Sequence, residues 1–254
     1  MKKDLPAHVL YEDENHKFVW LGADAENEEN VIQTNQYLIV NRGKGVLIDP
    51  GGVHLFSRVI SAVSKFISLD DIETVFFSHQ DPDVSSGIAL WMGVTPAKIY
   101  ISELWTRFIP HFGIVDWKRL VTIEETGYSH DLSGSSLLFI PSHFLHSAGC
   151  YSLYDTASKI LFSGDIGTAV FEDRQYLFAD DFESHLKLID SFHRRYMCSS
   201  MVLKKWISIV SKNEIDMIAP QHGAVYRGDS VPKLFEYLGS LKCGIDNIDE
   251  LYKQ

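Results

Sequence analysis

Short apolar segments recur along this chain from about residue 36, and several of them end at a histidine or an aspartate. The segment ETVFFS is followed by HQDPDV, and three later apolar segments each precede one further residue of the same kind. The six candidates are His79, Asp81, Asp83, His146, Asp165 and His222. Because the loops that follow strands meet at one edge of an α/β fold, we expect these side chains to converge. Taken alone, Asp81 and Asp83 are as typical of a turn as of a metal site, and His146, Asp165 and His222 are more typical of the surface, a cap or a loop. The set together predicts a metal site.

The pattern of strands and helices favours two packed sheets over a single doubly wound sheet. The runs YLIV and VLID flank the turn NRGKG, and GCYSLYD and KILFSGD form a second hairpin. Amphipathic segments follow at HLFSRVISAVSKF, at residues 180–212 and at SVPKLFEYLGSLK. No GxGxxG follows the first strand, and no linker divides the chain. We therefore predict a four-layer α/β-β/α sandwich in a single domain, residues 1–254.

Composition limits the classes of partner and the compartment. The formal net charge of −11 argues against nucleic acid and against an anionic membrane surface. No segment has the length of a membrane span, and the first residues contain no apolar signal sequence. Three scattered cysteines are typical of buried thiols in a reducing cytosol. The sequence therefore predicts a cytoplasmic protein.

Taken in order, these motifs resemble the metallo-β-lactamase-fold superfamily, whose usual signature is HxHxDH followed by a distant His, an Asp and a last His. Asp49, in LIDPG, resembles the early aspartate of that superfamily, which supports the site without binding metal. Asp81 is a carboxylate where zinc hydrolases have histidine, and flavodiiron proteins have HxExDH there. The chain is most similar to the stand-alone oxygen-binding diiron proteins, which lack the flavodoxin domain.

This resemblance implies two iron ions, with manganese or zinc as alternatives, and no flavin bound by this chain. One metal takes His79, Asp81 and His146, the other takes Asp83 and His222, and Asp165 bridges the two. An anionic ligand at Asp81 lowers the Lewis acidity of its metal, which favours binding of O₂ or NO over hydrolysis.

Two departures from the flavodiiron pattern concern the second metal. Asp81 is one methylene shorter than glutamate, and Val84 replaces the last histidine of the motif. Three interpretations remain open: an open position for an exogenous ligand, another histidine such as His143 or His54, or a weak second site. Val84 is then the residue that best distinguishes holding oxygen from reducing it.

Three aromatic residues lie close to ligands in the sequence and either wall the site or pack in the core, namely Trp91, Phe144 and Tyr151. Of these we expect Tyr151 to donate its O–H to bound oxygen.

The predicted function is oxygen sensing by a diiron site. The alternatives are reduction of O₂ or NO with a separate electron donor, and then hydrolysis. The chain has no remaining length for a flavin domain, so we expect an unidentified signalling or electron-transfer protein as partner. The resemblance to flavodiiron proteins also implies a homodimer.

Overall fold

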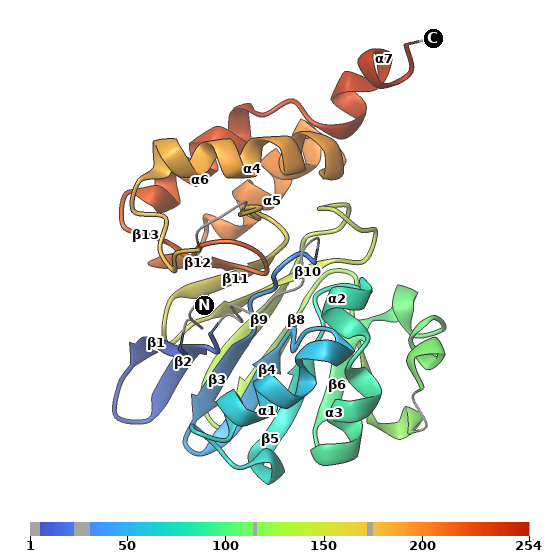
Figure 1. Ribbon diagram of the computed structural model, residues 1–254, viewed down its shortest axis with the longest axis vertical. Coiled ribbons are helices and arrows are strands. Elements are labelled where there is room, and N and C mark those ends of the chain that lie inside the picture. Colours follow the sequence, from blue (N-terminus) through green and yellow to red (C-terminus); the bar gives the residue numbers. More distant parts are fainter. Residues whose placement is uncertain (1–5, 23–30, 114–115, 172–174, 254) are drawn as a thin grey trace.

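The computed structural model describes residues 6–22, 31–113, 116–171 and 175–253, and its backbone forms two sheets that pack face to face (Figure 1). The first sheet has seven strands in chain order, and its last four strands are parallel. Its strands are β1 (His8–Glu12), β2 (His16–Trp20), β3 (Tyr37–Asn41), β4 (Lys44–Ile48), β5 (Ile72–Phe76), β6 (Lys98–Ser102) and β7 (Leu120–Ile123).

The second sheet has six strands in the order β13-β12-β11-β10-β9-β8, and only β11 and β12 are parallel neighbours. Its strands are β8 (Tyr128–Leu132), β9 (Ser135–Pro141), β10 (Tyr151–Asp155), β11 (Ile160–Gly164), β12 (Met217–Pro220) and β13 (Tyr226–Arg227). The strands β9, β11 and β12 all run in one direction, because β10 is antiparallel to both β9 and β11.

Helices cover the outer face of each sheet (Figure 1). The first sheet carries α1 (Phe56–Val63), α2 (Pro82–Ser85) and α3 (Ile88–Val94). The second carries α4 (Phe182–Tyr196), α5 (Ser200–Val210) and α6 (Ser230–Ser240), and α7 (Ile248–Leu251) projects from the body. The predicted four-layer sandwich is confirmed.

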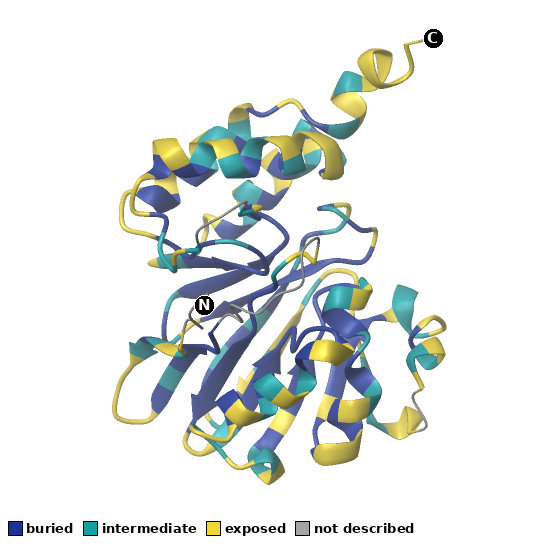
Figure 2. Cartoon of the chain, in the orientation of Figure 1, coloured by how far each residue is buried: buried dark blue, intermediate teal, exposed yellow. Residues whose placement is uncertain are grey.

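Alternation along the strands produces three apolar layers. Most of the strands are buried, as the dark blue ribbon of Figure 2 shows. In and after β5, Val75 and Phe77 face α1 and α3, whereas Phe76 lies between the sheets against Phe139 and Phe162. A period of two thus assigns each side chain to one of two cores.

Several elements differ from the sequence-based prediction. The helical region at 180–212 is two helices, because Met197 is extended and Ser199 caps α5 by accepting from the N–H of Val202. The short strands β1, β2, β7 and β8 carry little periodicity and were not predicted. Among the described residues, no helix is long and apolar enough to cross a bilayer.

A buried ion pair joins the two sheets at the edge opposite the carboxyl end of β5. His16 begins β2 and Asp155 ends β10, and the His16 Nε2 lies 2.7 Å from the Asp155 Oδ2 with both side chains buried. Burial lowers the pKa of His16, but the Asp155 carboxylate outweighs this effect and raises it above the ordinary value.

Replacing His16 by alanine should lower the free energy of unfolding by about 3 kcal/mol, because Asp155 would remain buried without its partner. A raised pKa in the folded state stabilises the protein below the ordinary histidine pKa, and this contribution is lost as pH rises through the raised value. Urea unfolding of wild type and His16→Ala at about pH 6 and about pH 9 should therefore show a larger difference at the lower pH. Equal differences at both pH values would contradict the assigned charge.

Candidate metal centre

All six sequence-predicted residues follow the carboxyl ends of strands, five of them on loops and Asp83 in the first turn of α2. His79, Asp81 and Asp83 follow β5 of the first sheet, and Asp81 directly precedes α2. The other three follow strands of the second sheet, namely His146 after β9, Asp165 after β11 and His222 after β12. Since β9, β11 and β12 share one direction, these three loops emerge at the same edge and face the β5 loop.

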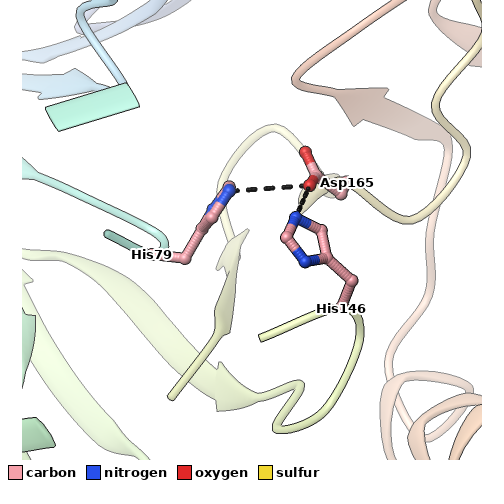
Figure 3. Close-up of side chains that lie close together, drawn as sticks. All are labelled: His79, His146 and Asp165. Atoms are coloured by element: carbon pink, nitrogen blue, oxygen red, sulfur yellow. Dashed lines mark ion pairs between the residues drawn. The ribbon is translucent and has the colours of Figure 1, made fainter. Parts of the chain in front are cut away.

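Asp165 lies at the centre of the cluster (Figure 3). Its Oδ2 is 3.5 Å from the Nε2 of His79 and 2.8 Å from the Nε2 of His146. Its Oδ1 is 3.5 Å from the Nε2 of His222 and accepts no hydrogen bond. The carboxylate thus presents one oxygen to His79 and His146 and the other oxygen to His222.

Asp81 lies beside His79 and His146, whereas Asp83 lies beside His222. The Asp81 Oδ2 lies 3.7 Å from the His79 Nε2 and 3.3 Å from the His146 Nε2. The Asp83 Oδ2 lies 3.4 Å from the Nε2 of His222. Donor atoms of His79, His146 and Asp165 all lie within 4.8 Å of one another, which is compatible with a single ion between them. The structure therefore brings the predicted residues together as two groups that share Asp165.

The electrostatics of the cluster fit a cation site. Burial raises the pKa of Asp83. Burial acts in the same direction on Asp165, but the three imidazoles outweigh it and hold the Asp165 pKa well below its usual range. Burial lowers the His146 pKa, and the Asp165 and Asp81 carboxylates reverse this and raise it to about 10. The inward-facing carboxylates therefore attract positive charge, which a metal ion supplies with the imidazoles neutral.

Hydrogen bonds on the far side of two rings turn their Nε2 atoms inward. The His79 Nδ1 lies 2.9 Å from the Oγ of Ser78, whose hydroxyl donates to the fully buried Asp49. Burial raises the Asp49 pKa to about 8, although hydrogen bonds from Ser78 oppose the rise. The His222 Nδ1 donates to the carbonyl of Gln33 at 2.8 Å. Such partners fix the orientation of metal-binding imidazoles, and Asp49 acts on His79 through Ser78.

Sequence reasoning missed Gln80, which joins two of the loops. Its Nε2 donates to the Asp81 Oδ1 at 2.9 Å, and its Oε1 accepts from the Ser147 hydroxyl at 2.7 Å. These bonds hold the short Asp81 side chain with its Oδ2 toward His79 and His146. A glutamine inside the motif carries no pattern that distinguishes it from a solvent-exposed residue.

The structure does not give Tyr151 its expected role. Its O–H donates to the carbonyls of Ile123 and Glu124, at 3.2 and 3.1 Å, so it is already engaged at the end of β7. Trp91 belongs to α3 and is buried in the core of the first sheet, and Phe144 is half exposed. The Phe and Tyr rings that contact His146 are instead Phe192 and Tyr196 of α4, which lie far from it in the sequence.

Neither candidate for the replacement histidine belongs to the cluster. His143 lies 2.8 Å from the carbonyl of Glu125 through its Nε2, and His54 is exposed after Gly52. Val84 is fully buried among apolar side chains of the first-sheet core and has no ligand atom.

Comparison with known proteins agrees with this geometry. The family model described as "ODP family beta lactamase" matches residues 32–223 of this chain. This chain belongs to that family.

Two ODP structures match nearly the whole chain. A peroxy diiron species of the chemotaxis sensor ODP is 57% identical with a TM-score of 0.88 and covers 98% of this chain and 100% of that one. The apo chemotaxis sensor ODP from T. denticola is 56% identical with a TM-score of 0.89 and the same coverage.

More distant relatives of the ODP family share the fold within longer proteins. The rubredoxin oxygen:oxidoreductase from Desulfovibrio gigas is 17% identical with a TM-score of 0.80, over 91% of this chain and 61% of that one. The anaerobic nitric oxide reductase flavorubredoxin of Enterobacter sp. is 31% identical, over 76% of this chain and 41% of the relative. An uncharacterized protein of Methanocaldococcus jannaschii is 27% identical, over 76% of this chain and 49% of the relative. The chain therefore spans about half or less of the length of these two curated relatives.

Replacing Gln80 by methionine should weaken metal binding on the His79 and His146 side by about 10-fold or more, because Asp81 would lose the bond that orients it. Titration of the metal-free protein with Co²⁺, followed by visible absorption, measures this change. Binding on the Asp83 and His222 side should keep its wild-type affinity. An unchanged affinity on both sides would show that Gln80 does not position Asp81.

Proposed function

We propose that this chain is an oxygen-binding non-haem diiron protein that acts as a sensor of O₂ or NO. The observation that carries the proposal is the division of the Asp165 carboxylate, whose two oxygens face separate histidine groups. The 57% identity with the chemotaxis sensor ODP, over nearly the full length of both chains, supports iron and oxygen as the metal and ligand.

The proposal gives each ion its own set of side chains. His79, Asp81 and His146 would hold one iron, Asp83 and His222 would hold the other, and Asp165 would serve both. Imidazole and carboxylate are ligands suited to iron or manganese, whereas zinc hydrolases rely more on imidazole and thiolate. When bound, two ferrous ions supply the electrons that dioxygen binding requires.

The protein's own groups tune this site. Asp81 places a negative charge where an imidazole would be neutral, and Gln80 fixes its orientation. Ser78 and the Gln33 carbonyl hold His79 and His222 with Nε2 inward. Phe192 and Tyr196 stack on each other beside His146, so two aromatic rings flank this ligand.

Reduction of O₂ or NO is the second candidate function. It is favoured by the 31% identity with a protein named as an anaerobic nitric oxide reductase flavorubredoxin. Such a reaction needs a rapid electron donor, and we propose that this donor is a separate protein.

The proposal extends to the setting of the site. We infer a cytoplasmic homodimer that transmits the state of its irons to a signalling protein. The relatives described as chemotaxis sensors support the signalling role, and the net charge of −11 supports a partner that is neither nucleic acid nor membrane. The homodimer rests on the likeness to flavodiiron proteins.

The test is metal analysis of protein purified without air, followed by its visible spectrum after air is admitted. We expect two irons per chain and a visible absorption band that persists. Rapid loss of the band with consumption of an added reductant would instead indicate the reductase. Two zinc ions with no response to air would contradict both and favour a hydrolase.

Two histidines on one loop provide a matched control. His146→Gln should lower the iron content and abolish the persistent band, because His146 contacts both Asp81 and Asp165. His143→Gln should retain both irons, because His143 bonds to the Glu125 carbonyl outside the cluster. Loss of iron from the His143 variant would instead indicate that His143 binds metal in place of the histidine missing at Val84.

A further inference from the structure

The Asp83 and His222 side of the cluster has fewer ligand atoms than the other side. Asp83, His222 and one oxygen of Asp165 are the cluster groups that face it, whereas two histidines and Asp81 face the other oxygen. Val84 stands where the flavodiiron motif has a histidine, and it packs in the apolar core. A cation on this side therefore needs a further donor from another part of the chain.

Gln221 provides a buried carboxamide at this place. It follows β12 and directly precedes His222. Its backbone N–H donates to the carbonyl of Gly164 at 2.8 Å, and its own carbonyl accepts from the N–H of Asn35 at 2.5 Å. The side chain is 0% exposed, and its Nε2 lies 3.5 Å from the Asp83 Oδ2. The carboxamide is thus fixed beside the second group of ligands.

The carboxamide oxygen of Gln221 is unsatisfied. Among the described residues, the Oε1 of Gln221 has no hydrogen-bond partner, and the contact of its Nε2 with Asp83 is at the outer limit of a hydrogen bond. Gln80, the glutamine on the opposite side of the cluster, has both ends of its amide bonded. A fully buried amide oxygen without a partner costs free energy, so its presence next to Asp83 needs a reason.

We propose that the Gln221 Oε1 is a ligand of the metal ion held by Asp83, His222 and Asp165, in place of the histidine that Val84 replaces. The inference rests on the proposed diiron function and specifies the ligand set of its second ion. A carboxamide oxygen is neutral, like imidazole, so the exchange keeps the charge of the site, and oxygen donors suit ferrous iron.

The Gln221 carboxamide already lies beside a proposed ligand of the same ion, because its Nε2 is 3.5 Å from the Asp83 Oδ2. Without a cation, the Asp83 carboxylate attracts the amide N–H of Gln221. A cation beside Asp83 attracts the amide oxygen instead, and a half-turn about the last side-chain bond exchanges the two atoms. The unsatisfied oxygen then gains its partner.

Two substitutions of similar shape test the proposal in the metal-free full chain, with Co²⁺ as the probe and visible absorption as the readout. Gln221→Met removes both polar atoms and should weaken the second Co²⁺-binding step by about 10- to 100-fold while the first step is unchanged. Gln221→Glu keeps an oxygen at the same place and should bind the second Co²⁺ at least as tightly as wild type.

The glutamate variant separates a ligand from a hydrogen-bond donor. If Gln221 only donates its N–H to Asp83, a glutamate there would repel the Asp83 carboxylate and weaken the second step, and that result would overturn the proposal. Unchanged second-step affinity in Gln221→Met would also overturn it and leave the diiron function intact. A wild-type chain that binds a single ion would overturn the function and the inference together.

Thermal unfolding provides a readout that does not depend on activity. Metal-free Gln221→Met should unfold at the wild-type temperature or above it, because a buried unsatisfied oxygen is removed. The rise in unfolding temperature on saturation with Co²⁺ should be smaller than in wild type, because binding energy stabilises only the folded state. A metal-free variant that is less stable, with an unchanged rise on Co²⁺ binding, would assign Gln221 a purely structural role and contradict the proposal.

Discussion

The buried carboxylate of Asp165 is the group on which the rest of the site depends. A carboxylate at this depth is costly unless positive charge surrounds it, and three imidazoles from three different loops meet it. Each of its two oxygens faces a separate set of ligands, and this division separates a two-ion site from a single-ion site. The proposed functions of Asp81, Asp83 and Gln221 all follow from which oxygen of Asp165 they accompany.

The fold serves this arrangement by directing four strands to one edge. The β5 loop approaches from the first sheet, and the loops after β9, β11 and β12 approach from the second. The opposite edge is closed by the ion pair of His16 with Asp155, so the two sheets are joined by buried charge at one edge and by the ligand loops at the other. The packed rings between the sheets keep these two edges apart.

The sequence predicted the two-sheet architecture and the six clustered residues, because both depend on period-two apolar segments and on polar residues at their ends. It did not predict what depends on contacts distant in sequence. Gln80 meets Ser147 and Gln221 meets Asp83 only after folding, and neither glutamine belongs to a recognisable pattern. The expected hydrogen bond from Tyr151 failed because nearness in sequence does not give the direction of a side chain on a strand, and its O–H reaches Ile123 and Glu124. The organisation as one domain stays a prediction.

Anomalous diffraction from crystals of the iron-loaded protein, recorded on both sides of the iron absorption edge, tests the central claim most directly. Two iron peaks should flank Asp165, one beside the oxygen that faces His79 and His146 and the other beside the oxygen that faces His222. A single iron peak, or two peaks that leave His222 without a metal contact, would contradict the account.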